Sequence, residues 1–253
     1  MSAAKKKASN TSNFFLRSWR LIKKIFFILF IAQFIYILLL KWVNPPVTVT
    51  QLVSLITGDG LKRDYVPMNE ISSNARLAAM AAEDQLFPDH GGFDWKSIEK
   101  AMDYNKRKPN RVRGASTISQ QTAKNVFLWQ GKSWFRKGLE IYFTKMIEWV
   151  WGKKRILEVY LNVAEMGKGI YGVEAASQKY FNKPAKNLSR SEAAMILSCL
   201  PNPKKYTVVP LSTYVAKRFP WVLIQMNNLE GDPDVQKLIY DKSDPKSDPN
   251  QWK

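Results

Sequence analysis

The feature that most restricts how this chain can fold is a long apolar run near its N terminus. Residues 25–40 are apolar apart from Gln33 and Tyr36, and apolar neighbours extend the run to residues 21–43. A helix of about 20 such residues crosses the hydrocarbon core of a bilayer. A cleaved signal peptide is the alternative, but the run is long for one and no small-x-small cleavage site follows it. We therefore predict an uncleaved transmembrane anchor over residues 21–43.

Positive charge is distributed unevenly around this run. Basic residues and no acidic residue precede Asn44: Lys5, Lys6, Lys7, Arg17, Arg20, Lys23, Lys24 and Lys41. Only Lys41 follows the apolar run, so the positive-inside rule predicts that residues 1–20 are a basic cytoplasmic tail. The chain after Asn44 is then expected to lie outside the cytoplasm.

Composition narrows the class of partner. The formal net charge is +18 at pH 7, which suits anionic partners. A membrane anchor favours phospholipid head groups and a lipid diphosphate, so we expect no nucleic acid. Cys199 is the only cysteine, which excludes an intramolecular disulfide, and it stands in an apolar run typical of a buried residue. His90 is the only histidine, which excludes the H-E-x-x-H metal motif.

After the anchor, the chain reads as mainly α. Pro45 and Pro46 end the span, and residues 47–56 have the Val and Thr content typical of a strand. Helical patterns begin at Ile71. We predict a linker, a single helical domain and a polar C-terminal tail, over residues 44–70, 71–230 and 231–253.

Capping signals predict where several helices begin. Asp94 is a suitable N-cap. Thr117 and Gln120 have the spacing of a capping box, and so do Ser189 and Glu192. The first predicted helix ends near Glu83, and the others cover residues 95–104, 117–127, 133–152, 153–164, 189–201 and 212–231.

Glu83 is the first candidate for chemistry. It ends a helix beside a turn that contains Gly91 and Gly92, where a carboxylate can face a cleft. The unperturbed pKa of Glu is about 4.3, so an ionised Glu83 can take a proton from an attacking hydroxyl. Taken alone, the Glu83-Asp84 pair is more typical of solvated surface carboxylates. Asp84 could orient Glu83 or a cation.

A polar turn leads into the helix predicted to begin at Thr117. Ser116 and Thr117 lie at the helix start, where free N–H groups and the helix dipole favour an anion. Gln121 and Lys124 share a helix face, and Asn125 follows. An ordinary capped helix explains Thr117, but it does not explain Gln121, Lys124 and Asn125. We therefore predict a diphosphate or sugar site.

A second carboxylate is framed by cations. Arg136, Lys137 and Glu140 are three or four residues apart and therefore share one helix face. As an isolated pattern this is a surface salt bridge worth under about 1 kcal/mol. Together with Glu83, this pattern of charges says more about function, because cations can hold a negatively charged leaving group. A base, and cations for a diphosphate, are what a glycosyl transfer from a diphosphate donor needs.

Five segments, in order, resemble a known family. They read E-D-x-x-F-x-x-H-x-G-F-D (83–94), R-G-A-S-T-I-x-Q-Q-x-x-K-N (113–125), R-K-x-x-E (136–140), K-R-I-L-E-V-Y-L-N with G-K-G-I-Y-G (154–172), and L-S-R-S-E-A-A with L-P-N-P (188–203). This order resembles the peptidoglycan glycosyltransferases of family fifty-one. The chain is too short for a transpeptidase domain after the match, so it is similar to the monofunctional biosynthetic enzymes.

The resemblance implies a lysozyme-like helical domain and an activity. The implied reaction polymerises lipid II into β-1,4 glycan strands, with inversion at the donor sugar and release of undecaprenyl diphosphate. Glu83 would be the general base, and Glu140 would organise the cations or a divalent metal such as Mg2+, with no cofactor obligatory. The implied substrate-binding residues are Asp84, Ser116, Thr117, Gln121, Lys124, Asn125, Arg136 and Lys137. Many family members have a lysine where Asn202 stands. Asn202 cannot supply that positive charge, so we do not assign it the role of the lysine.

Two other functions stay open. A lysozyme-like enzyme that cleaves glycan also needs a carboxylate in a helical cleft, but it needs no cluster of cations. A non-catalytic scaffold of cell-wall synthesis would not need Glu83 and Glu140 together. Aromatic side chains between residues 127 and 151, near Lys132, are equally compatible with core packing and with contact to a membrane interface.

The expected surroundings follow from the anchor and the resemblance. The predicted location is the bacterial cytoplasmic (inner) membrane, crossed once, with the N terminus in the cytoplasm and the catalytic domain periplasmic. The expected partners are lipid II, the lipid-linked glycan strand and the membrane, with cell-wall synthesis or division proteins as further candidates.

Overall fold

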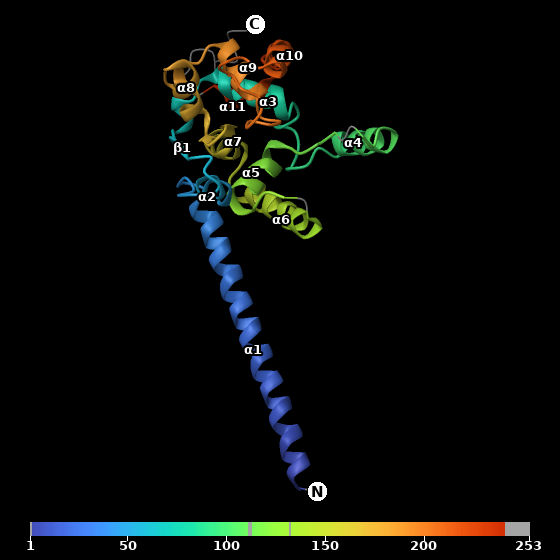
Figure 1. Ribbon diagram of the computed structural model, residues 1–253. Helices are drawn as coiled ribbons and strands as arrows, with labels where there is room; N and C mark the ends of the chain where they lie inside the picture. The colour runs from blue at the N-terminus through green and yellow to red at the C-terminus, as the bar shows by residue number, and fades with distance from the viewer. Residues whose placement is uncertain (1, 111–112, 132, 241–253) are drawn as a thin grey trace. The chain divides into compact units, whose positions relative to one another are not determined.

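The computed structural model describes residues 2–110, 113–131 and 133–240. The chain divides into two compact units, Met1–Val43 and Asn44–Lys253. The first consists mainly of α1 (Ser2–Leu39), whose segment Leu16–Leu39 is 24 residues long and apolar enough to cross a membrane (Figure 1). The predicted N-terminal apolar helix is therefore present.

The second unit is built mainly of helices, as predicted. They are α2 (Val49–Ile56), α3 (Ser73–Glu83), α4 (Trp95–Arg107), α5 (Ile118–Phe127), α6 (Trp134–Val150), α7 (Lys153–Val163), α8 (Val173–Phe181), α9 (Arg190–Ser198), α10 (Thr213–Leu229) and α11 (Pro233–Ile239). Two short 3-10 helices cover Met68–Glu70 and Ala185–Asn187. A small sheet in the order β1-β3-β2 is formed by β1 (Lys62–Arg63), β2 (Glu165–Gly167) and β3 (Ile170–Tyr171). In it β3 pairs parallel with β1 and antiparallel with β2.

Helix α3 lies at the centre of the core. Every residue from Ala75 to Ala82 is buried, and the small alanine side chains let neighbouring helices approach closely. Helices α9, α10 and α11 pack against α3, and α5 packs against α6 and α7 (Figure 1). Because α3 also meets α7, its last residue, Glu83, lies where these two groups of helices come together.

The capping signals begin helices where they were predicted. The side chain of Asp94 accepts a hydrogen bond from Ser97 N at the start of α4. Thr117 and Gln120 form a complete capping box before α5. Ser189 and Glu192 do the same before α9. These predictions succeeded because a cap joins residues at most three positions apart, whose distance the helix geometry sets.

The strand-like composition of residues 47–56 does not produce a strand, because residues 49–56 form α2. Thr48 and Gln51 cap it reciprocally, with Gln51 N donating to Thr48 Oγ1 at 3.3 Å and Thr48 N donating to Gln51 Oε1 at 3.1 Å. Both residues are buried, and Gln51 Nε2 also donates to the hydroxyl of Tyr65 at 2.8 Å. Local capping and tertiary contacts outweigh the strand propensity of Val and Thr. Much of the predicted linker is thus packed structure.

The predicted polar tail is wrong for residues 233–239, which form α11. Asp232 caps this helix, and Val235 and Ile239 are each 1% exposed. The buried guanidinium of Arg76 on α3 donates to the carbonyl of Ile239 at 2.8 Å. A buried arginine needs acceptors, and α11 supplies one of them. The rest of the predicted tail, residues 241–253, lies outside the described residues.

This packing predicts that Ile239→Ala destabilises the protein by about 2–5 kcal/mol, the usual effect of truncating a buried Ile. Chemical denaturation of the full chain would measure the change. Lys237→Ala is the matched control on the same helix, since Lys237 is 74% exposed in its side chain and pairs with Asp234 at the surface. The control should change stability by less than about 1 kcal/mol. Equal stability of Ile239→Ala and the natural protein would show that α11 adds nothing to the core.

Candidate active site

Glu83 lies where the packing of α3 places it, with its side chain 14% exposed. Its Oε2 accepts a hydrogen bond of 2.8 Å from Nε2 of Gln121 on α5. The hydroxyl of Tyr160 on α7 donates to Oε1 of Gln121 at 3.4 Å. Since the amide oxygen of Gln121 faces Tyr160, its NH2 group faces Glu83. The structure therefore brings the predicted residues Glu83 and Gln121 together and adds Tyr160 to them.

The second carboxylate oxygen of Glu83, Oε1, is buried without a hydrogen bond within the described residues. Burial raises the pKa of Glu83, while the hydrogen bond from Gln121 and the charges of Arg218 and Lys124 act against that rise. A carboxylate with a raised pKa and an open oxygen is suited to accept a proton.

The predicted cluster on α6 exists, and its carboxylate is buried. Arg136 Nη1 lies 2.6 Å from Oε2 of Glu140, and Lys137 Nζ lies 2.5 Å from Oε1. Glu140 is 3% exposed, and Arg136 Nε also donates to the carbonyl of Gly131 at 2.9 Å. We call Arg136, Lys137 and Glu140 the α6 cluster. Because both cations are held by one carboxylate, their positions are set before any ligand binds.

Lys124 connects the two carboxylates electrostatically. Burial lowers its pKa, Glu140 and Glu83 raise it, and Arg136 and Lys137 lower it. Within the described part of the chain the side chain of Lys124 forms no hydrogen bond or ion pair. Helix α5 thus places Gln121 against Glu83 and, one turn later, carries Lys124, whose charge interacts with both carboxylates.

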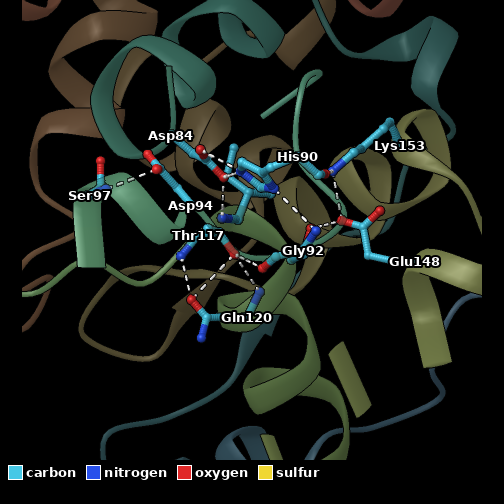
Figure 2. A network of polar contacts seen from close by, with 11 residues as sticks. Asp84, His90, Gly92, Asp94, Ser97, Thr117, Gln120, Glu148 and Lys153 are labelled. Carbon is cyan, nitrogen blue, oxygen red and sulfur yellow. Dashed lines mark hydrogen bonds and ion pairs between the residues drawn. The ribbon is translucent and has the colours of Figure 1, made fainter. Parts of the chain in front are cut away.

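Asp84 and Thr117, both predicted to bind substrate, have partners within the protein (Figure 2). Asp84 is buried, and its carboxylate accepts from Ile118 N at 2.9 Å and contacts His90 Nε2 at 3.0 Å. Thr117 Oγ1 donates to the carbonyl of Gly92 at 2.8 Å. The carboxylate of Asp84 therefore takes the helix-start N–H that was expected to meet a substrate anion.

His90 connects the turn after α3 to Asp84. Its Nδ1 accepts a hydrogen bond from Gly92 N at 3.1 Å, so the ring proton is on Nε2, which donates to Asp84. Figure 2 shows this network joining the turn after α3 to the first turn of α5. It continues through Lys153, whose Nζ lies 2.7 Å from Oε1 of Glu148. The sequence did not reveal the Glu148–Lys153 pair, which forms between the end of α6 and the start of α7.

The remaining predicted residues flank α5. Ser116 is exposed just before the helix. Asn125 is partly exposed, and its Oδ1 accepts a hydrogen bond from Gln130 Nε2 at 3.4 Å. Near Asn202, Lys204 does not supply a free charge, because it lies 2.5 Å from the carboxylate of Asp59.

The α6 cluster does not fit a divalent metal. Each oxygen of Glu140 already faces a cation, Arg136 or Lys137, so a metal ion there would meet two like charges. In the described residues no group of three or more His, Cys, Asp or Glu side chains could hold an ion. We therefore assign no step to a metal at Glu140.

The aromatic side chains of residues 127–151 divide between core and surface. Phe127 stacks on Phe143 with a ring separation of 4.6 Å, and Trp151 is buried. Trp134 and Trp149 on α6 are 93% and 75% exposed. Lys132, predicted to lie among these aromatics, is outside the described residues.

Comparison with known proteins found matches that cover about 70% of the chain or more. Residues 50–227 match the family model described as "Transglycosylase". A "Biosynthetic peptidoglycan transglycosylase" of Escherichia coli strain Crooks is 59% identical over 178 residues, which are 70% of this chain and 74% of that protein. The protein of the same description from Yersinia pseudotuberculosis serotype O:3 is 55% identical over 194 residues, which are 76% of this chain and 80% of that protein.

Proposed function

This chain belongs to the transglycosylase family and is a peptidoglycan glycosyltransferase, and on that premise we propose that it polymerises lipid II into β-1,4-linked glycan strands. The observation that carries the proposal is that one unit holds both a proton acceptor and fixed cations. The proton acceptor is Glu83, whose buried Oε1 accepts no hydrogen bond within the described residues, and the cations are those that Glu140 holds in the α6 cluster. The charge of Lys124 interacts with both groups. The chemistry of a sugar attached to a diphosphate needs both.

The α6 cluster is the side of the site that would hold the donor diphosphate. Arg136, Lys137 and Lys124 carry three positive charges against the single carboxylate of Glu140. The excess charge suits a diphosphate, which gains negative charge as its bond to the sugar breaks. Since Glu140 orients two of these cations in advance, little reorganisation is needed when the leaving group departs.

Glu83 is the side of the site that would serve the acceptor sugar. Its carboxylate takes the proton of the acceptor 4-hydroxyl, and the oxygen attacks the anomeric carbon of the donor. The bond from that carbon to the diphosphate breaks on the opposite face, so an α-linked donor gives a β-1,4 product. Undecaprenyl diphosphate leaves with the electron pair, stabilised by Lys124 and the α6 cluster.

Two observations argue against the alternative functions. An enzyme that cleaves finished glycan releases no diphosphate, so cations fixed on the buried Glu140 would have no task in it. A scaffold without catalysis would not need a buried carboxylate such as Glu83 with an unbonded oxygen, an arrangement that is unfavourable for stability.

A labelled lipid II assay tests the proposal directly. The full chain in detergent should convert lipid II into polymer that lysozyme then digests. Shortened products from preformed strands would indicate a cleaving enzyme, and the absence of any product from a folded protein would indicate a scaffold. Either of these results would contradict the proposed reaction.

We also propose that the enzyme is anchored by α1 with its N terminus in the cytoplasm and its catalytic unit outside it. The supporting observations are the apolar segment Leu16–Leu39 and the excess of basic residues before it. The exposed aromatic side chains of Trp134 and Trp149 would suit contact with the membrane interface that holds the lipid-linked substrate.

This topology predicts the behaviour of reporter fusions at the two ends. A reporter active only in the periplasm should work after Lys253, and a reporter active only in the cytoplasm should work before Met1. Activity of the cytoplasmic reporter at the C terminus would reverse the assignment.

A further inference from the structure

Arg218 on α10 forms an ion pair with Glu83 that sequence patterns did not reveal. Its Nη2 lies 3.7 Å from Oε1 of Glu83, the buried oxygen that has no hydrogen bond within the described residues. The other oxygen, Oε2, already accepts from Gln121. Arg218 therefore faces the one oxygen of Glu83 that is left to receive a proton.

The guanidinium of Arg218 is held by groups other than Glu83. Nη2 donates to the carbonyl of Ala82 at 2.9 Å, in the last turn of α3. The guanidinium also lies over the ring of Trp221, 5.6 Å from its centroid. Helix α10 packs along α3, and Gln85, just after α3, donates from Nε2 to Oε1 of Gln225 on α10 at 3.3 Å. The position of the charge is thus set by the packing of these helices.

The distance to Glu83 has a chemical consequence. At 3.7 Å the guanidinium is too far away for a hydrogen bond, so the lone pairs of Oε1 stay available to an incoming hydroxyl. At the same distance a positive charge still favours the ionised form of a carboxylate. A shorter contact would stabilise the carboxylate as well, but it would occupy the atom that must accept the proton.

We propose that Arg218 is a positioning residue for glycosyl transfer, which keeps Glu83 ionised inside a buried site while leaving Oε1 free to act as the base. The inference rests on the proposed role of Glu83 in the reaction. Arg218 need not touch either sugar, because it acts through the carboxylate of Glu83.

Other groups near Glu83 also influence whether its carboxylate is ionised. They come from α3, α5, α7, α9 and α10 and their ends: Asp84, Lys124, Tyr160, Cys199 and Arg218. Burial raises the pKa of Tyr160 well above its usual range and that of Cys199 to about 12, so both stay neutral while Glu83 titrates. Burial and Asp84 raise the pKa of Glu83, whereas Arg218 and Lys124 lower it.

The first test needs no activity. Ionisation of Glu83 weakens the fold as the pH rises through its raised pKa, and loss of the Arg218 charge should raise that pKa further. Arg218→Gln should therefore lose more stability at about pH 8 than at about pH 5. In the Glu83→Gln background this difference between the two pH values should disappear. A difference that persists there would mean that Arg218 acts on another group.

The second test is the pH profile of lipid II polymerisation. In Arg218→Gln the acid limb of kcat/KM should move upward by about 1 pH unit or more, and activity should recover at high pH. Each unit of displacement corresponds to about a tenfold loss at a pH on the limb. Arg218→Lys, which keeps the charge, should leave the limb close to its original position.

Arg190→Gln is the matched control. Arg190 has a side-chain exposure of 28%, close to the 26% of Arg218, and it pairs with Glu230 away from the site. Its replacement should not move the limb. If Arg218→Gln does not fold, Arg218→Lys still tests the proposal. An equal loss of activity at every pH in Arg218→Lys would overturn it. Should Glu83→Gln retain polymerisation, the proposed function itself fails, while the stability test of the Arg218–Glu83 coupling stands separately.

Discussion

Replacing Glu83 by Gln is expected to reduce polymer formation about 100- to 10,000-fold in a protein that stays folded, because general-base catalysis contributes a factor of that size. Gln keeps the volume of the side chain and can still accept the hydrogen bond from Gln121, but it cannot take a proton. Retention of a lipid diphosphate donor should be little changed, since the α6 cluster is untouched. Initial rates with labelled lipid II would measure the loss.

The same substitution should raise the melting temperature at neutral and higher pH. The pKa of Glu83 is raised, chiefly by burial, so its ionised form destabilises the fold increasingly as the pH rises through that pKa. A neutral amide removes this pH-dependent cost. Inactivity combined with higher stability is typical of a residue kept for function at the expense of the fold.

Glu165→Gln is the matched control for Glu83→Gln. Burial also raises the pKa of Glu165, whose Oε1 accepts from Gly169 N at 3.2 Å, and Glu165 has no place in the proposed reaction. The control should show a stability change of the same sign and keep its polymerase activity. Near-normal polymerisation by Glu83→Gln would overturn the mechanism.

Replacing Glu140 by Gln is expected to abolish polymerisation and also to lower stability, the opposite sign to Glu83→Gln. Glu140 is buried and holds both Arg136 and Lys137, so its loss leaves two cations without their counter-charge. Removing one partner of a buried ion pair costs about 3–5 kcal/mol, and the lower end applies because the Lys137 side chain is 38% exposed. Donor retention should weaken too, because the cations lose their fixed positions.

Thermal melts and donor binding by the folded fraction would check this prediction. Glu158→Gln is a suitable control, since Glu158 pairs with Arg155 at 2.6 Å on α7, in a partly buried ion pair outside the α6 cluster. It should lose stability while activity per folded molecule is kept. Unchanged stability of Glu140→Gln would show that the cations do not depend on Glu140 for their placement.

The parts of the site that lie within one helix could be predicted from the sequence. The α6 cluster was predicted correctly because Arg136, Lys137 and Glu140 are separated by three or four positions on one helix. The capping boxes before α5 and α9 were predicted for the same reason. In each case the helix itself brings the side chains together, whatever surrounds it.

The roles of Asp84 and Thr117 could not be predicted in this way. Both stand beside residues that serve the site, and sequence order alone suggests that they share its task. Only the fold shows that Asp84 meets Ile118 N and His90, and that Thr117 meets Gly92. Similarly, the helical patterns did not reveal that Val235 and Ile239 are buried against the core.

By itself, then, the sequence determined the apolar N-terminal helix, the helical class of the second unit, and the residues within one turn of each other that form caps and the α6 cluster. The tertiary structure alone decided which distant groups face Glu83. Arg218 and Ala82, whose hydrogen bond fixes the guanidinium near Glu83, are 136 positions apart. A separation within one helix turn is converted into a distance by the helix geometry. A separation of this size becomes a contact only through the packing of α10 on α3, which depends on the buried side chains of the whole core.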